Sequence, residues 1–369
     1  MKVLLVNREK GWGGGQEYLK DMAVELRRRG IEFWFVVRKG SPSETRFREH
    51  GFPVHTMPYR HGLSDFKALL GLISLFKAER FDIISVNREH DLFMIALAFR
   101  LAFPFRRRGR LMMTYHIPVE RKQIALGTVD AIVCVSEHVR DTLLRYNPKT
   151  AAKTNVLYCG IVMREAPPPS RFARDRRRRF FTDHGFPIIG MVGALWKNQV
   201  ELVEMTPRLM EEFPGITVAL VGNTDDISLL APVQERVRRL GLEKNVIFTG
   251  FVPRERIDDI FHDMDLSVTT HRNEGFGIVH LESLAAGTPV VAYNEGGFVD
   301  IFRGEDAGVL VDGGPDEFAA VVLDLLKDDE RRFAMGDSGY SLVKRRYSIE
   351  AMGDSYLKLY RGLIDAQSP

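Results

Sequence analysis

Cysteine is scarce in this chain of 369 residues, which contains only Cys134 and Cys159. Two cysteines cannot form a disulfide framework, and their spacing does not match that of a metal site. Both lie in or beside apolar runs, so we expect small buried side chains in a reducing compartment. The composition therefore predicts a cytoplasmic protein.

Long apolar runs are absent too. No stretch of about 18 or more apolar residues occurs, which is the length that a membrane-spanning helix needs. The N-terminal segment MKVLLVNRE is a short apolar run followed by charge, which predicts a strand rather than a signal peptide.

The net charge is small, +3 at pH 7, but arginines gather at residues 106–110 and 176–179. Such clusters can meet phosphates, an anionic membrane or nucleic acid, although a solvated face is the commoner reason for them. Neither cluster is interleaved with aromatic residues or accompanied by a binding motif, so we predict no nucleic-acid partner.

The chain is long enough for two domains, and one pattern runs through both halves. Short β-branched runs alternate with amphipathic helices, which predicts parallel sheets covered by helices on both faces. The strands are expected at residues 3–6, 33–37, 81–86, 111–114, 131–135 and 156–157, and then at 188–192, 217–221, 246–248, 266–269, 290–292 and 309–311.

Three consecutive prolines at residues 165–170 (EAPPPS) cannot continue a helix or a central strand and predict a linker. The fold class is therefore α/β, with two Rossmann-like, doubly wound domains at residues 1–165 and 171–348 that face each other across a cleft. Open sheets of this kind bind ligands outside the carboxyl ends of their strands.

The strongest local signal is EGFGIVHLE, from Glu274 to Glu282. It follows an expected strand and leads into a helix, so Gly275 and Gly277 would let a ligand approach the backbone closely. The first-turn amides of the helix could hold a diphosphate. A carboxylate that accepts from two neighbouring hydroxyls would suit a ribose. A tight turn with a buried carboxylate explains the segment equally well.

The segment EGFGIVHLESLAAGTPVVA resembles the E-x7-E motif of glycosyltransferase family 4. Further stretches are similar to the family in order and spacing: the glycine loop 13–15 with Gln16 and Glu17, the strand segments 81–86 and 130–136, and the segments 192–193, 220–222 and 246–250. The resemblance covers nearly the whole chain.

This resemblance implies a retaining, metal-independent glycosyltransferase of the GT-B fold, which takes a UDP- or GDP-linked sugar, a hexose in the first instance, and needs no other cofactor. The C-terminal domain would bind this donor, and the N-terminal domain would bind a saccharide or lipid-linked saccharide acceptor. A last helix at about residues 349–369 would pack back onto the first domain. Cell-envelope or surface polysaccharide biosynthesis is the expected setting.

The resemblance also assigns roles to single residues. Glu282 would bind the donor ribose, and Glu274 would contact the sugar or its phosphate. His116 would hydrogen-bond the transferred sugar, although a lone histidine is as often structural. The further donor-binding candidates are Gly14, Gly15, Gly193, Gly275, Phe276, Gly277, Gly296 and Gly297.

The phosphate cations are where the chain departs from the family. The usual Gly-Arg-Leu is replaced by Gly193-Ala194-Leu195, and a lysine, Lys197, follows early. A positive group at the leaving phosphate would lower the barrier by a few kcal/mol. Lys197 is the best candidate for that role, although an exposed surface lysine is the alternative. His271 and Arg272 are plausible substitutes for the missing arginine. Cys159 stands where the family commonly has asparagine.

Asp263-Met264-Asp265 has the form D-x-D of the metal-binding signature of other transferases, but three residues are a weak signal. Asp265 stands where the family has an acidic residue entering a strand, so we interpret it as structural and predict no metal.

Residues 91–105 are apolar on nearly all faces, which is typical of a buried helix. They run into the arginines at 106–110, and apolar surface beside basic charge also suits a membrane interface. Peripheral contact with an anionic bilayer at the inner face of the membrane is therefore a second hypothesis for this segment.

Two other functions remain open at this stage. Nucleotide-sugar epimerases share the fold and would release the nucleoside diphosphate from the donor alone. A non-catalytic nucleotide-sugar-binding protein could also keep the fold, and Ala194 is the residue that favours this alternative.

Overall fold

The computed structural model describes residues 1–58, 63–105, 108–163 and 179–366, without the side chains of residues 63–65. The expected linker at 165–170 and the arginines at 106, 107 and 176–178 lie outside the described residues. The chain divides into two compact units. The first unit is Met1–Val162 with Ile349–Pro369, and the second unit is Met163–Ser348.

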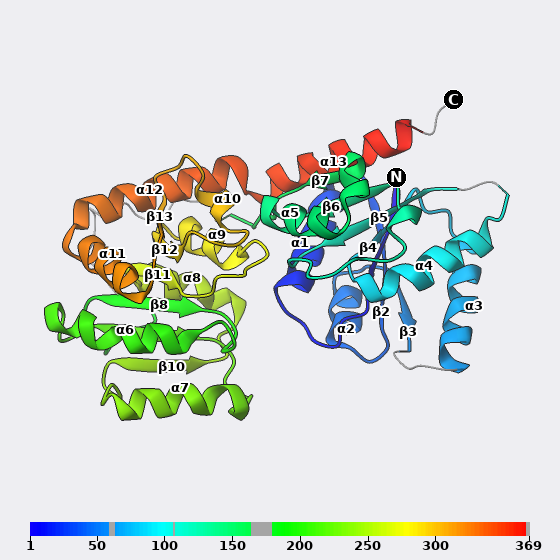
Figure 1. The fold of residues 1–369 in the computed structure, drawn as a ribbon. Coiled ribbons are helices and arrows are strands. Elements are labelled where there is room, and N and C mark those ends of the chain that lie inside the picture. Colours follow the sequence, from blue (N-terminus) through cyan, green and yellow to red (C-terminus); the bar gives the residue numbers. More distant parts are fainter. Residues whose placement is uncertain (59–62, 106–107, 164–178, 367–369) are drawn as a thin grey trace. The chain divides into compact units, whose positions relative to one another are not determined.

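The first unit is built on a seven-stranded parallel sheet with the order β3-β2-β1-β4-β5-β6-β7 (Figure 1). Its strands are β1 Lys2–Asn7, β2 Glu32–Arg38, β3 Val54–Met57, β4 Ile83–Val86, β5 Arg110–Tyr115, β6 Ala131–Cys134 and β7 Thr154–Val156. Its helices are α1 Gly14–Arg28, α2 Pro42–Glu49, α3 Leu63–Ala78, α4 Glu89–Ala102, α5 Glu137–Tyr146 and α13 Ile349–Asp365, with short 3-10 turns η1 Leu126–Thr128 and η2 Pro148–Lys153. The central strands are buried on both faces, as their apolar runs require.

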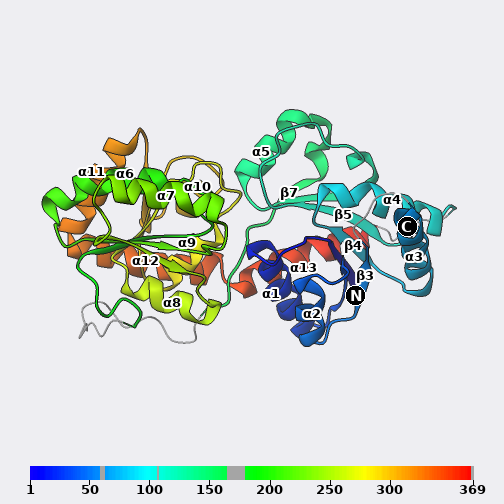
Figure 2. The ribbon, with the colours of Figure 1, turned by 90° about the horizontal axis from the view of Figure 1, so that it is seen from below.

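The helices of the first unit lie on opposite faces of this sheet. Right-handed crossovers place α3 and α4 on one face and α1 and α2 on the other, because the strand order runs in opposite directions on the two sides of β1. Figure 2 shows this division and places α13 beside α1. The hydroxyl groups of Tyr18 and Tyr356 lie 2.5 Å apart at the contact between α1 and α13. The last helix is therefore part of the core of the first unit.

The second unit has a six-stranded parallel sheet with the order β10-β9-β8-β11-β12-β13. Its strands are β8 Ile188–Val192, β9 Thr217–Val221, β10 Val246–Gly250, β11 Leu266–Thr269, β12 Val290–Tyr293 and β13 Gly308–Val311. Its helices are α6 Gln199–Glu212, α7 Ile227–Arg239, α8 Arg254–Asp263, α9 Ile278–Ala285, α10 Val299–Phe302, α11 Pro315–Lys327 and α12 Asp329–Arg346. The helix pairs α6–α7 and α6–α11 pack on one face, and α8–α9 and α9–α12 pack on the other.

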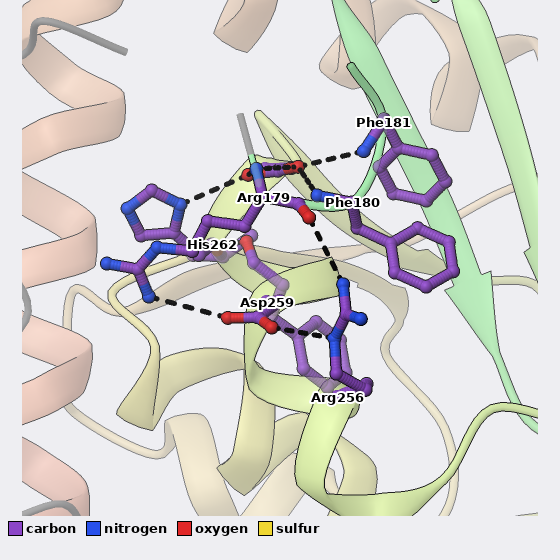
Figure 3. A network of polar contacts seen from close by, with 9 residues as sticks. Arg179, Phe180, Phe181, Arg256, Asp259 and His262 are labelled. Atoms are coloured by element: carbon purple, nitrogen blue, oxygen red, sulfur yellow. Dashed lines mark hydrogen bonds and ion pairs between the residues drawn. The ribbon is translucent and has the colours of Figure 1, made fainter. Parts of the chain in front are cut away.

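Both carboxylates of the D-x-D sequence have structural partners in the second unit. Asp263 accepts hydrogen bonds from the backbone amides of residues 179, 180 and 181 and from His262 (Figure 3). Burial opposes its ionisation, but the bonds from His262 and the amides lower the pKa of Asp263 below its usual value. Asp265 accepts from the Ile188 amide at 2.9 Å and thereby joins the start of β8 to β11. These bonds account for the acidic residues without a metal ion.

The helix expected at residues 91–105 is α4, and only one of its faces is buried. Leu92, Ile95 and Phe99 face the interior, whereas Phe93 and Leu101 are exposed. The interpretation as a wholly buried helix was therefore wrong. No helix in the described part of the chain is both long and apolar enough to cross a membrane.

Candidate functional site

Lys197 and Glu274 meet at the carboxyl end of the second sheet. Lys197 lies in the loop after β8 and Glu274 in the loop after β11, and these two strands are neighbours where the strand order reverses. The Lys197 Nζ lies 2.5 Å from Glu274 Oε2, and the side chains are only 18% and 20% exposed. Ligands of doubly wound sheets bind at this reversal point. Two residues that are 77 positions apart thus form one half-buried ion pair.

The charge state of Glu274 follows from this pair. Burial by itself would raise the pKa of the carboxyl group, but the charge and hydrogen bond of Lys197 lower it below its usual value. Glu274 is therefore a carboxylate at neutral pH, and Lys197 is the cation beside it.

A glycine turn follows Glu274 and begins helix α9. Gly277 has φ +85°, and a Cβ at this position would lie 2.5 Å from His280 Cδ2, so both the backbone and the space require glycine. Gly275 donates its amide to Glu274 Oε1 at 3.2 Å. Phe276 is buried, with its ring centroid 5.8 Å from that of Tyr347. The turn therefore fixes the start of α9, where first-turn amides can bind an anion.

The second glycine pair, Gly296 and Gly297, packs directly against the loop that carries Glu274. Gly297 donates its amide to the Glu274 carbonyl at 2.8 Å. A Cβ on Gly296, whose φ is +86°, would lie 2.7 Å from the Arg272 carbonyl oxygen. These glycines therefore let two loops of the site touch.

The side chain of Arg272 is held by Tyr293 and Glu295. Its guanidinium lies 3.5 Å over the Tyr293 ring and is paired with Glu295 at 2.6 Å. The two bonds to Glu295 and to the Gly313 carbonyl orient the cation toward the loops after β12 and β13. A role at the phosphate would require Arg272 to leave Glu295.

Two histidines flank the ion pair. His271 lies edge-on to Trp196 at 5.3 Å, and burial lowers its pKa. His280 is almost fully buried against Phe298, and burial lowers its pKa to about 4, so it is neutral at pH 7. Sequence reasoning did not single out His280, although its place inside the E-x7-E segment was the available signal.

Glu282 lies one turn further along α9 and faces a basic residue. The Arg254 Nη2 is 3.7 Å from Glu282 Oε1, and the Glu282 side chain is 20% exposed. Arg254 begins α8 and was not predicted, because an arginine in a turn carries no distinctive signal. Glu282 and Arg254 thus lie close together at the edge of the same turn.

Ala194, which stands where the family usually has arginine, lies in a compact loop. Gly193 has φ +150° and donates its amide to the Val221 carbonyl at 2.8 Å. The Ala194 carbonyl accepts from Gln199 at 2.7 Å, which ties the loop to the start of α6. Ala194 is itself exposed. This geometry brings Lys197 back toward Gly193, with its Cδ 3.2 Å from the place a Cβ on Gly193 would occupy.

The corresponding end of the first sheet carries a pair of neutral polar groups beside the ion pairs of Arg8 and Arg88. Asn87 follows β4 and His116 follows β5, and His116 Nε2 lies 3.1 Å from Asn87 Oδ1. Asn87 donates its amide nitrogen to the Ser85 carbonyl at 3.3 Å, so Oδ1 is the atom that faces His116. His116 therefore donates from Nε2, and burial lowers its pKa to about 4. The ring of Tyr18 meets it edge-on at 5.3 Å.

The glycine loop of the first unit needs no small residues for its own packing. A Cβ on Gly14 or Gly15 would meet no other atom within 4 Å. Gly13 precedes α1 and donates its amide to Gln16 Oε1 at 2.9 Å, and Gln16 in turn donates to Asn7 Oδ1 at 3.3 Å. The open space over these glycines leaves the start of α1 accessible.

Comparison with known proteins decides the family. Residues 12–165 match the family model described as Glycosyltransferase Family 4, and residues 173–342 match the one described as Glycosyl transferases group 1. The chain belongs to glycosyltransferase family 4. This confirms the family that the sequence predicted and identifies the chain as a glycosyltransferase.

Solved structures share the whole fold of this glycosyltransferase. HepE from Anabaena, solved in complex with UDP, superimposes with a TM-score of 0.81 at 20% identity over 98% of this chain and 100% of its own. A glycosyltransferase from Rickettsia africae gives a TM-score of 0.84 at 17% identity over 98% of both chains. The predicted α/β GT-B fold with two Rossmann-like sheets is thus confirmed.

The sequence relatives align with a smaller part of this chain than the solved structures do. The D-inositol 3-phosphate glycosyltransferase of Corynebacterium jeikeium is 30% identical over 242 residues, which is 64% of this chain and 58% of that protein. A GDP-mannose-dependent alpha-(1-6)-phosphatidylinositol monomannoside mannosyltransferase of Mycolicibacterium smegmatis is 28% identical over 76% of this chain and 79% of its own. The chain spans about half the length of the first curated relatives that it matches.

Proposed function

We propose that this glycosyltransferase is a retaining, metal-independent enzyme that moves a hexose from a UDP- or GDP-linked donor to a saccharide or lipid-linked saccharide. The observation that carries the proposal is the Lys197–Glu274 pair beside the glycine turn of α9. It combines a cation, a carboxylate and helix-end amides within one loop cluster, which is what a sugar diphosphate requires.

The donor phosphates are assigned to Lys197 and to the amides at residues 275–277. Breaking the bond between the sugar carbon and the diphosphate leaves an electron pair, and hence negative charge, on the phosphate oxygen. A fixed cation and oriented amides stabilise that charge in the transition state. Both carboxylates of the D-x-D sequence are engaged by backbone amides, so the chain's own cation is the group proposed to act on the leaving phosphate.

Glu274 and Glu282 are assigned to hydroxyl groups of the donor. Glu274 lies beside Lys197 and Glu282 beside Arg254, and a carboxylate can accept hydrogen bonds from sugar or ribose hydroxyls. Donor binding would then transfer Lys197 from Glu274 to the diphosphate. In retaining transfer the acceptor oxygen bonds to the face that the diphosphate leaves, and its proton passes to the departing phosphate oxygen.

The neutral side chains of the first unit are assigned to sugar hydroxyls. Neutral His116 would hydrogen-bond the transferred sugar, and Asn87 holds the His116 ring through Nε2. A relative that acts on a phosphatidylinositol monomannoside supports a lipid-linked saccharide as one acceptor class, in cell-envelope or surface polysaccharide biosynthesis.

The first experiment is a thermal-shift screen against UDP-, GDP-, ADP- and TDP-sugars, followed by a transfer assay with the sugar that stabilises the protein. A donor at about 100 times its dissociation constant should add about 2.7 kcal/mol of stability. Release of the nucleoside diphosphate with interconversion of free sugars, and no acceptor required, would assign an epimerase instead. Donor binding without any turnover would assign the non-catalytic alternative that Ala194 keeps open.

A further inference from the structure

Helices α3 and α4 expose a row of large apolar side chains. On α4, Phe93, Leu97 and Leu101 repeat every four residues and are 61%, 38% and 48% exposed. On α3, Phe66 and Leu70 have the same spacing and are 61% and 50% exposed. Together with the fully exposed Phe105, these residues form what we call the α3–α4 apolar surface.

The two helices present these residues away from the sheet, because each also has a buried side. Phe76 on α3 and Phe99 on α4 are buried, and their ring centroids lie 5.7 Å apart where the helices pack together. Both helices therefore pack against the core through other side chains than the exposed ones. Large apolar groups repeated on two adjacent helices are uncommon on a surface that meets only water.

The exposed charged side chains that the structure describes around this surface are basic. Five exposed side chains on or beside the two helices are basic: Lys67, Lys77, Arg80, Arg100 and Arg108. The described acidic side chains nearby are already engaged. Glu79 is paired with Lys2, Glu89 with Arg121 at 2.7 Å, and the buried Asp91 with Arg8 at 2.6 Å. The surface therefore combines apolar groups with a rim of available cations.

We propose that the α3–α4 apolar surface docks the first unit on an anionic lipid bilayer. Phenyl and leucyl groups would enter the headgroup boundary, while lysine and arginine side chains extend to the lipid phosphates. Apart from the basic side chains, the described outer face has few hydrogen-bonding groups, Ser74 among them, whereas protein interfaces carry about one hydrogen bond per 100–200 Å². Neither helix can cross the membrane, so the contact lies in the plane of the bilayer.

The inference rests on the proposed function only for its purpose, which is to bring a lipid-linked acceptor within reach. Binding to lipid itself depends on α3 and α4 alone. Donor binding depends on the second unit. The two proposals can therefore fail separately.

The test is flotation of the full chain with vesicles of phosphatidylcholine alone or of phosphatidylcholine with phosphatidylglycerol. We expect binding to the mixed vesicles that weakens as salt rises, and little binding to the neutral ones. Phe93→Gln with Leu97→Gln should reduce the bound fraction by roughly tenfold or more, because two apolar side chains that would enter the bilayer are lost. Lys67→Gln with Arg100→Gln should reduce binding less and flatten its salt dependence.

The matched control is Ile124→Gln with Ile227→Gln, which removes two apolar side chains that are 76% and 73% exposed elsewhere. This variant should bind vesicles as the unmodified chain does. Equal binding by the Phe93→Gln/Leu97→Gln variant, or no binding of the unmodified chain to anionic vesicles, would overturn the proposal. So would a vesicle-free dimer that this variant dissociates, because the surface would then belong to a second copy. Thermal shifts with nucleotide sugars should be unchanged in every variant, and their absence from the unmodified chain would count against the proposed function alone.

Discussion

The carboxyl ends of the two sheets bring together different polar side chains although the strand order of both sheets reverses in the same way. In both units the strand order reverses between a first strand, β1 or β8, and the fourth, β4 or β11. The second unit places ion pairs there, including Lys197 with Glu274. The first unit has ion pairs there too, Arg8 with Asp91 and Arg88 with Glu9, and adds a neutral pair after β4 and β5, His116 with Asn87. One architecture can thus carry different sets of polar groups by changing only the loops.

The largest effect is expected from substitutions in the Lys197–Glu274 ion pair. Lys197→Ala should lower kcat about 10²- to 10³-fold, because it removes a cation from the leaving phosphate. Glu274→Ala should cause a loss of similar size, since Glu274 is proposed to contact the donor and it pairs with Lys197. Steady-state kinetics with saturating donor is the measurement. Lys244→Ala and Glu243→Ala, both exposed on the second unit, are the matched controls, and equal rates in all four variants would refute the site.

Substitutions in the His116–Asn87 pair of the first unit should lower the transfer rate less. Asn87→Ala is expected to lower kcat/KM for transfer about 10- to 100-fold, because His116 loses the hydrogen bond that fixes its tautomer. Donor-induced thermal shifts should stay the same, since Asn87 lies in the first unit. A nitrogen NMR spectrum should show the proton of His116 on Nε2 in the unmodified chain and a mixture of tautomers in the variant. A single unchanged tautomer would contradict the role of Asn87.

The two glycine turns offer a matched pair of substitutions. Gly277→Ala should destabilise the second unit by about 1–3 kcal/mol, because it places a methyl group against His280 at a positive φ. Gly14→Ala has open space and should leave stability unchanged or slightly raised. If a ligand approaches Gly14, that variant will still lose activity. Thermal melts and transfer assays of both variants separate the two requirements.

The effect that is absent at neutral pH is a pH dependence of stability from His280. Its folded pKa of about 4 lies below the ordinary value of 6.5, so the unfolded chain binds the proton more readily between these values. The contribution is fully present above about pH 6.5 and is lost as the pH falls toward 4. At about 1.4 kcal/mol per pH unit, the loss is on the order of 3 kcal/mol at pH 4. His280→Gln should flatten the melting temperature over this range, and an unchanged slope would show that His280 titrates normally.

Much of the fold could be predicted from the sequence because the strands are short apolar runs with clear ends. The predicted strands at 188–192, 217–221 and 266–269 coincide with β8, β9 and β11. Strand β3, Val54–Met57, was missed, since it lies at the edge of its sheet and carries His55 and Thr56. An edge strand is exposed on one side and lacks a continuous apolar run.

The candidate site was predicted as single residues rather than as pairs. Lys197 and Glu274 were each expected from their places after strands, but their ion pair follows from the strand order, which joins β8 to β11. Asn87 and Arg254 were missed for the same reason: their partners are 29 and 28 positions away. Their assigned roles in binding and catalysis stay predictions.

Helix α13 gives the chain an unusual order of assembly. The second unit is inserted in the sequence of the first. The contact between Tyr18 of α1 and Tyr356 of α13 can therefore form only once residues 349–365 are present. A chain that stops before residue 349 can complete the sheet of the second unit, while its first unit still exposes the apolar face of α1. Such a chain would therefore hold one finished unit and one unfinished unit. Competence for sugar transfer would then depend on α13.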